Sequence, residues 1–292
     1  MRRFALTSSA LVPLFALIAG CAVIVVPEDG NAQIKSAFGG DAVRGNGQVV
    51  TEQRAVGAGV DGVDINGSLI VTVRVGPAPS LTVEGDSNLL PLLRTDASSG
   101  TLRVRTEGSI YTTSPLRVTL TVPRLRQAEA SGSGRLLVSG LDGGDFDLRL
   151  NGSREAEIAG RVGRFDVRLN GSGSMNASGL ASTAIDATLN GSGRLQLGRL
   201  QGQSLTLDQR GSGSASASGS VERLRVRLSG SGSADLAGLA SRDADIATNG
   251  SGSVTAMASG SLVAGSNGSG SITVYGNPAQ RSVSGKRITL VQ

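Results

Sequence analysis

Apolar residues recur at every second position in short runs on both sides of a repeated Gly-Ser-Gly phrase. Before the first glycine of the phrase, these runs are Phe146, Leu148 and Leu150; Phe165, Val167 and Leu169; Ile185, Ala187 and Leu189; Leu205 and Leu207; and Leu224, Val226 and Leu228. After that glycine they are Leu136 and Val138; Ala156 and Ile158; Leu195 and Leu197; Leu236 alone; and Ile272 and Val274. Because successive side chains of a strand point to opposite faces, each run predicts a strand with one buried face.

The phrase returns at intervals of 18 to 20 residues, its first glycines being Gly132, Gly152, Gly171, Gly191, Gly211, Gly230, Gly250 and Gly268. One repeat is expected to be a strand, a Gly-rich turn, a second strand and a second turn, the latter carrying Gly140, Gly160, Gly179, Gly219, Gly238 and Gly276. A unit of this size cannot bury its apolar face alone, but copies stacked about 4.8 Å apart bury a continuous column. Glycine reaches the positive φ that a sharp corner needs. The pattern predicts an all-β fold, a right-handed parallel β-helix with about 20 residues per coil.

Residues 49–122 keep the strand alternation but lose the strict phrase, and we expect them to form a β-rich N-terminal cap. Within this cap, residues 88–93 are expected to form a short helical turn or a loop. The repeat β-helix is expected over residues 123–292, with residues 283–291 closing its C-terminal end. A disordered Gly-Ser linker is the alternative, but such linkers lack apolar residues at period two.

The first residues have the features of an export signal. Arg2 and Arg3 precede an apolar stretch that ends in Leu17-Ile18-Ala19-Gly20 before Cys21, the only cysteine of the chain. This order resembles a bacterial lipobox, so we predict a lipoprotein signal peptide over residues 1–20 and lipidation of Cys21. Residues 21–48 would then be a flexible tether. An uncleaved anchor that continues through residues 22–26, or cleavage after Ala32, are the alternatives. Each of the three exports the remaining chain, and the lipobox places it on a membrane, with the outer membrane or cell surface as the expected location.

Charges lie mainly at the outward positions of the expected strands. The net charge is +5, the arginines are scattered and aromatic residues make up 2% of the chain, which argues against nucleic acid as a partner. Asp147, Asp166 and Asp186 fall at equivalent positions of successive repeats, with Arg149 and Arg168 beside them. We interpret these residues as a solvated ladder of ion pairs; a cation site along the aspartates is the alternative.

The chain contains no histidine, which excludes Ser-His-Asp and Cys-His catalysis. The turns hold serine where calcium-binding repeats need aspartate, and the Gly-x-Gly sequences precede no expected helix. We therefore expect no catalytic, metal-binding or cofactor-binding residues. The leading hypothesis is a non-enzymatic envelope module that binds a protein or glycan. The alternative is a β-helix enzyme or binder acting on polysaccharide through Asp147, Asp166, Asp186, Arg149 and Arg168.

The order of elements from Val49 to Gln292 resembles a known family. The matching features are Asn66-Gly67-Ser68 before a valine-rich strand, Gly85-Asp86-Ser87-Asn88, the loop to Gly100-Thr101-Leu102-Arg103-Val104, Val118-Thr119-Leu120-Thr121-Val122-Pro123, and the Gly-Ser-Gly series. This order is similar to that of the head GIN domain family, whose members carry the label of auto-transporter adhesins. The resemblance implies an exported right-handed β-helix, often on a lipoprotein, and supplies no catalytic residues.

Overall fold

The computed structural model describes residues 22–25, 33–36 and 42–291, which fall into two compact units, Met1–Ala42 and Val43–Gln292. In the first unit, β1 (Ala22–Val25) pairs antiparallel with β2 (Gln33–Ser36). The predicted signal peptide and the lipidation of Cys21 lie outside the described residues. Within the described part of the chain, no helix is long and apolar enough to span a bilayer.

The second unit consists almost entirely of strands over its described residues. Its N-terminal part contains β3 (Val43–Arg44), β4 (Val49–Arg54), β5 (Gly62–Asn66), β6 (Leu69–Val75), β7 (Ser80–Asp86), the 3-10 turn η1 (Leu90–Leu92), β8 (Leu93–Ser98), β9 (Thr101–Thr106), β10 (Ile110–Tyr111) and β11 (Arg117–Val122). Its repeats contain β12 (Gln127–Gly132), β13 (Gly134–Asp142), β14 (Phe146–Gly152), β15 (Glu155–Gly171), β16 (Ser174–Gly191), β17 (Arg194–Gly211), β18 (Ser214–Gly230), β19 (Ser233–Gly250), β20 (Ser253–Gly268), β21 (Ser271–Tyr275), β22 (Gln280–Ser284) and β23 (Ile288–Val291). The 3-10 turn confirms the helical turn expected within residues 88–93.

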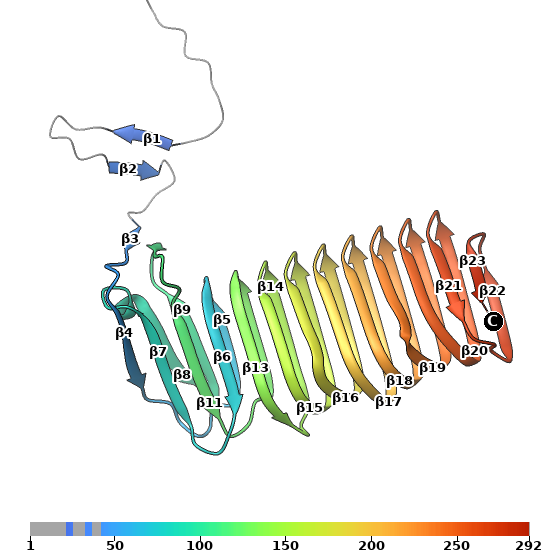
Figure 1. The fold of residues 1–292 in the computed structure, drawn as a ribbon, viewed down its shortest axis with the longest axis horizontal. Coiled ribbons are helices and arrows are strands. Elements are labelled where there is room, and N and C mark those ends of the chain that lie inside the picture. Colours follow the sequence, from blue (N-terminus) through green and yellow to red (C-terminus); the bar gives the residue numbers. More distant parts are fainter. Residues whose placement is uncertain (1–21, 26–32, 37–41, 292) are drawn as a thin grey trace, which may run out of the picture. The chain divides into compact units, whose positions relative to one another are not determined.

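The repeats stack in chain order, each strand pairing in parallel with the one a coil away. Figure 1 shows the row of coils from β13, in green, to β21, in red. Equivalent glycines are in register, so that Gly171 lies between Gly152 and Gly191. The predicted parallel β-helix with a coil of about 20 residues is thus confirmed.

The predicted second turn is a corner inside a continuous strand, at which Gly160 has φ +135°. β15 extends from Glu155 to Gly171 without a break, and the chain bends inside the strand at a β-bulge between Glu157 and Ala159. The bend adds a third inward-facing run to each coil. The sequence analysis predicted only the two runs on either side of the Gly-Ser-Gly phrase and missed this one. This run supplies one buried apolar residue in each of six coils, namely Leu141, Val162, Leu180, Leu200, Val221 and Leu239.

The Gly-Ser-Gly corner requires glycine for two reasons. Gly191 has φ +113°, which side chains other than glycine's rarely adopt, and a Cβ atom there would lie 2.4 Å from the carbonyl oxygen of Gly171. The corner also carries a short ladder of amides: Asn190 donates to Asn170 Oδ1 over 2.9 Å, and Asn170 donates to Asn151 Oδ1 over 3.0 Å. The Asn-Gly-Ser sequences therefore combine a backbone corner with hydrogen bonds between coils.

The N-terminal part does not stack in chain order. β5 and β6 pair in parallel with β12 and β13 of the first repeat, while β9 and β11, which come later in the chain, pair in parallel on the outer side of β5 and β6. β8 and β7 then pair antiparallel with β9 and β11, and β4 pairs antiparallel with β7. Figure 1 shows these strands gathered at the blue end of the unit. Parallel stacking thus changes to antiparallel pairing at this end.

Candidate functional site

The coil formed by β5 and β6 is open on one side. After Val75 the chain departs from this coil to form β7, and it returns to the repeats only through residues 123–126. In the later coils, by contrast, the chain goes on at this point to form the third inward-facing run. Leu141 supplies the third run in the first repeat coil, and the coil of β5 and β6 therefore has no matching residue stacked against it on the side of the cap. The missing segment leaves a cavity at the junction between cap and repeats.

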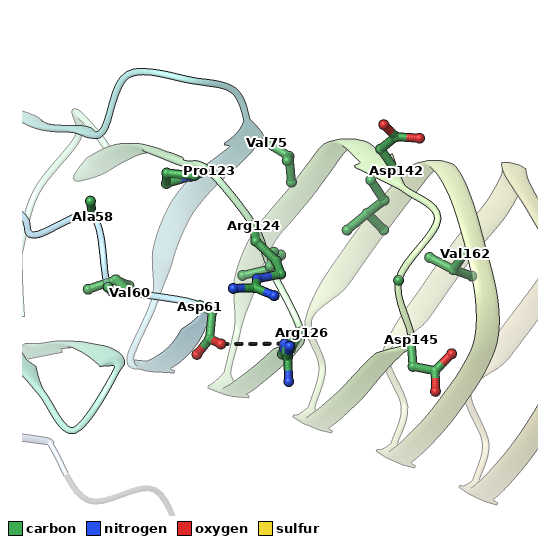
Figure 2. Close-up of a pocket in the computed structure, with 14 residues that line it drawn as sticks. Ala58, Val60, Asp61, Val75, Pro123, Arg124, Arg126, Asp142, Asp145 and Val162 are labelled. Atoms are coloured by element: carbon green, nitrogen blue, oxygen red, sulfur yellow. Dashed lines mark ion pairs between the residues drawn. The ribbon is translucent and has the colours of Figure 1, made fainter.

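This junction pocket has a volume of about 660 Å³. Its floor is aliphatic, formed by the buried residues Val60, Leu125, Leu141 and Val162. The remaining lining comes from the loop before β5, the end of β6, the segment between β11 and β12 and the corner between β13 and β14: Ala58, Gly59, Asp61, Val75, Pro123, Arg124, Arg126, Asp142, Gly144 and Asp145. Figure 2 shows that these segments, distant in sequence, face one another.

One side of the pocket is cationic. Arg126 forms an ion pair with Asp61, with 3.6 Å between Nε and Oδ2, and its backbone amide donates to the Asp61 carbonyl over 2.8 Å. Arg124 is exposed and makes no ion pair or side-chain hydrogen bond with the described residues. Its guanidinium is thus available to an anionic group.

The opposite side of the pocket is anionic and has a free strand edge. Pairing of β13 with β6 ends at Ser139 and Arg74, so among the described residues Leu141 and Asp142 have a strand partner only on the β15 side. Asp145 accepts the backbone amide of Arg164 at 3.0 Å, which fixes the corner. In Figure 2, Asp142 and Asp145 lie on the side away from Arg124, and their carboxylates point in different directions, out of the pocket.

The residues that the sequence singled out lie elsewhere, on the outward face of β14, β15 and β16. Arg149 contacts Asp147 at 3.4 Å, and Arg168 contacts Asp166 at 3.2 Å and Asp147 at 3.8 Å. Asp186 pairs with Arg164. The predicted ladder of ion pairs is confirmed, and within the described residues no group of three metal-ligating side chains was found.

Sequence reasoning missed a buried arginine near the junction. Arg154 replaces the third glycine of the phrase, and 1% of its surface is exposed. Its guanidinium donates to the carbonyls of Leu69 at 3.0 Å, Ser131 at 3.3 Å and Gly67. Burial lowers the pKa of this guanidinium. The side chain therefore ties the first coil to the repeats by bonding to backbone oxygens across two coils.

The pocket itself was also missed, although the sequence contains a signal for it. Asn66-Gly67-Ser68 matches the corner phrase, but the next corner glycine is Gly132, far beyond the usual interval of 18 to 20 residues. Such a gap means that the chain leaves the solenoid between two stacked coils. A cavity is expected at an interrupted coil, because the inserted segment does not trace the path that the chain takes in a complete coil.

Comparison with known proteins identifies the family of this chain. The model of a family described as "Putative auto-transporter adhesin, head GIN domain" matches residues 60–217 and 180–278, more than half of the chain, and the protein belongs to this family. A search of curated proteins found no match.

Solved structures share the fold at low sequence identity. A "putative lipid binding protein" from Parabacteroides distasonis is 21% identical with a TM-score of 0.66, covering 86% of this chain and 100% of that chain. A "putative adhesin" from Parabacteroides merdae is 20% identical with a TM-score of 0.66, covering 87% and 100%. A second "putative adhesin", from Parabacteroides distasonis, is 20% identical with a TM-score of 0.64, covering 86% and 100%.

Proposed function

We propose that this protein is a non-enzymatic, adhesin-like binding module of the cell envelope, and that the junction pocket is its binding site. The observation that carries the proposal is a preformed cavity of about 660 Å³ at an interrupted coil, with an aliphatic floor and charged groups around it. This size and lining are typical of ligand sites, which range over about 300–1,000 Å³. Membership in a family described as adhesins supports the same conclusion.

A binding role fits the side chains better than catalysis does. The chain has no histidine to act as general base, and Asp61 in the pocket is engaged by Arg126. The carboxylates considered for a polysaccharide enzyme, Asp147, Asp166 and Asp186, each contact an arginine on an outward strand face. Such pairs stabilise a surface and engage these three carboxylates.

The envelope location rests on the leader. The only cysteine, Cys21, follows small residues at the end of an apolar stretch, as expected of a lipidated protein. Cys21→Ser is expected to leave the precursor unlipidated and to release the protein from the membrane fraction. Retention of the variant in that fraction, with unchanged maturation, would contradict the lipid anchor.

Binding through the pocket is tested with labelled protein and isolated envelope fractions. Ala58 is exposed and lines the pocket, so Ala58→Trp should fill the cavity without disturbing the core. Ala240, exposed on the repeats, gives the matched control Ala240→Trp. We expect at least a tenfold loss of binding for Ala58→Trp, on the order of 1.4 kcal/mol, and none for the control. Equal binding by the two variants, or turnover of envelope polysaccharide by the unmodified protein, would overturn the proposal.

A further inference from the structure

We infer that the junction pocket binds the C-terminal end of an extended peptide whose last residue is aliphatic, with the terminal carboxylate at Arg124. This inference rests on the proposed binding function and names the chemical class of its ligand. It follows from three features of the pocket: a slot one strand wide, an aliphatic floor, and an arginine that has no ion-pair partner among the described residues.

The slot lies where β6 ends. β6 pairs with β11 on one side and with β13 on the other until it ends at Val75. The chain turns away there to β7, while both neighbours continue, β11 into residues 123–126 and β13 to Asp142, and both continuations line the pocket. Two strands that flank a third lie about 9.6 Å apart, which is twice the usual spacing of about 4.8 Å. The space beyond Val75 therefore has the width of one added strand.

The edge of β13 that borders this slot favours a peptide backbone. Leu141 and Asp142 have a strand partner only on the β15 side among the described residues, whereas residues 135–138 are paired on both sides. An extended peptide in the slot would pair with this edge as an added strand, through its backbone N–H and C=O groups. A hydrocarbon chain has no such groups and would leave the edge unpaired.

The slot admits the end of a chain and not its middle. β6 fills it up to Val75, so an added strand has to begin or end beside that residue. A strand that began there would run parallel to β13 and place its ammonium group beside Val75. A strand that ended there would run antiparallel to β13 and place its carboxylate there. The charges of the lining decide between the two directions.

The charges favour the carboxylate. Asp61 is paired with Arg126, and the carboxylates of Asp142 and Asp145 point out of the pocket in Figure 2, so these three groups do not compensate an ammonium group in the slot. Arg124 lies on the segment that borders the slot, is exposed, and forms no ion pair or side-chain hydrogen bond with the described residues. An arginine can hold a carboxylate through two parallel hydrogen bonds. The peptide therefore ends beside β6 and runs antiparallel to β13.

The floor selects an aliphatic last residue. Val60, Leu125, Leu141 and Val162 form it, all four are buried, and no aromatic residue belongs to the lining. A leucine or valine side chain against Leu141 would take the place that the third run leaves empty on the side of the cap, and would bury apolar surface there. A charged last side chain would lose its hydration on this floor without gaining a partner.

The test is calorimetric titration of the protein with the peptide acetyl-Ala-Val-Ala-Leu, whose blocked amino terminus carries no charge, and with three relatives. The first relative is the C-terminal amide, the second ends in glycine instead of leucine, and the third carries N-methyl groups on its backbone nitrogens. We expect a Kd about tenfold weaker or more for each, because each lacks the carboxylate, the aliphatic side chain or the backbone donors. Octanoate, an aliphatic carboxylate without a peptide backbone, should also bind more weakly than the peptide.

Three variants connect the binding to the pocket. Arg124→Gln should bind the acid and the amide with equal, weakened affinity, and Ala58→Trp should lose the peptide because it fills the cavity. Arg149→Gln, in the ion-pair ladder, is the control and should bind the acid like the unmodified protein. Equal binding of acid and amide by the unmodified protein, a preference for the acid that persists in Arg124→Gln, or octanoate binding as tight as that of the peptide would overturn the inference.

The outcomes separate this inference from the proposed function. A lack of peptide binding at about 1 mM, with envelope binding still lost in Ala58→Trp, overturns the peptide ligand alone. Peptide binding that depends on Arg124, together with envelope binding insensitive to Ala58→Trp, supports the inference and overturns the proposed envelope role.

Discussion

The repeat coils and the cap junction are built from the same strands but differ in how the chain closes each coil. From β15 to β20, each coil continues directly into the next through a Ser-Gly pair, and every inward run is covered by the coils on either side. At the junction, the chain leaves the first coil after Val75, and a later segment stacks outside it. The regular part thus gains stability from identical neighbours, while the irregular part gains a cavity.

The two regions also satisfy their corner carbonyls differently. In the repeats, the amide of Ser192 donates to the carbonyl of Gly171 at 3.0 Å, so backbone bonds to backbone. At the first corner, Arg154 donates to the carbonyl of Gly67. Between two regular coils, glycine is sufficient at the third position of the phrase. Between the cap coil and the repeats, this position holds Arg154, whose side chain reaches across two coils.

The largest expected effect lies in the repeats. Leu189 is fully buried, and Leu189→Asp would place a carboxylate without a partner in the apolar column. We expect a loss of about 4 kcal/mol in the free energy of unfolding, measured by chemical denaturation. Because repeats interact mainly with their neighbours, hydrogen exchange should locate the damage in β15 to β17. Unchanged stability would mean that this register of inward residues is wrong.

Next in size is the buried arginine of the junction. Arg154→Gly restores the Gly-Ser-Gly phrase, so a rule based on repetition alone predicts no loss. The structure predicts a loss of about 3 kcal/mol, because the carbonyls of Gly67 and Leu69 would lose their donor. Thermal and chemical denaturation decide between the two, with Arg149→Gln on the outer ladder as the control. A neutral Arg154→Gly would show that the junction follows the same corner rule as the repeats.

A third test separates the two costs of replacing a corner glycine. Gly191 and Gly143 both have positive φ, +113° and +77°, but a Cβ atom would meet the Gly171 carbonyl oxygen at Gly191 and nothing within 4 Å at Gly143. Gly191→Val should cost about 2 kcal/mol or more, and Gly143→Val closer to 1 kcal/mol. Ser192→Ala, at an exposed position, should stay within about 0.5 kcal/mol of the unmodified protein. Equal losses for the two glycines would mean that the contact with Gly171 relaxes without cost.

The sequence predicts the repeats well because one local rule holds from coil to coil. Period-two runs such as Phe165, Val167 and Leu169 identify the buried face, and the spacing of the corner glycines identifies the stacking. The third run escaped because it supplies as little as one apolar residue per coil, such as Val162, which follows a bulge between Glu157 and Ala159 that shifts the register. A single apolar residue per coil cannot show the period of two that identifies a strand in the sequence.

The junction could not be predicted in the same way, because its contacts join segments that are far apart in sequence. Arg154 is explained only once β5 and β6 are placed next to the repeats, since its acceptors precede it by 85 and 87 residues. The pocket depends on the same placement, with Ala58 and Asp145 on opposite parts of one lining. Because these coils stack out of chain order, the sequence shows only a long interval between the corner glycines Gly67 and Gly132, and no local pattern that would place the segments side by side.

The smallest expected effect concerns the outer face of the repeats. Asp245 accepts two hydrogen bonds from Arg227, at 2.7 and 3.1 Å, which together with Arg225 lower the pKa of its carboxyl. A lowered pKa in the folded state stabilises the fold above the unfolded pKa of about 3.9, and this contribution is lost as the pH falls through the folded pKa. Since 35% of the side chain is exposed, solvent screens the pair, and Asp245→Asn should cost only about 0.5 kcal/mol at pH 7.

The pH dependence of that small cost provides the control within the experiment. Urea denaturation of Asp245→Asn and the unmodified protein should give a larger difference at about pH 7 than at about pH 3, because the contribution of the carboxylate is lost as the pH falls through its lowered folded pKa. Asp96→Asn, at an exposed position without an ion pair among the described residues, should show little difference at either pH. A cost for Asp245→Asn that is equally large at about pH 3 would assign the loss to packing instead of charge. The pair of Arg227 and Asp245 would then resemble Arg154 at the junction, which acts through its fit to the backbone.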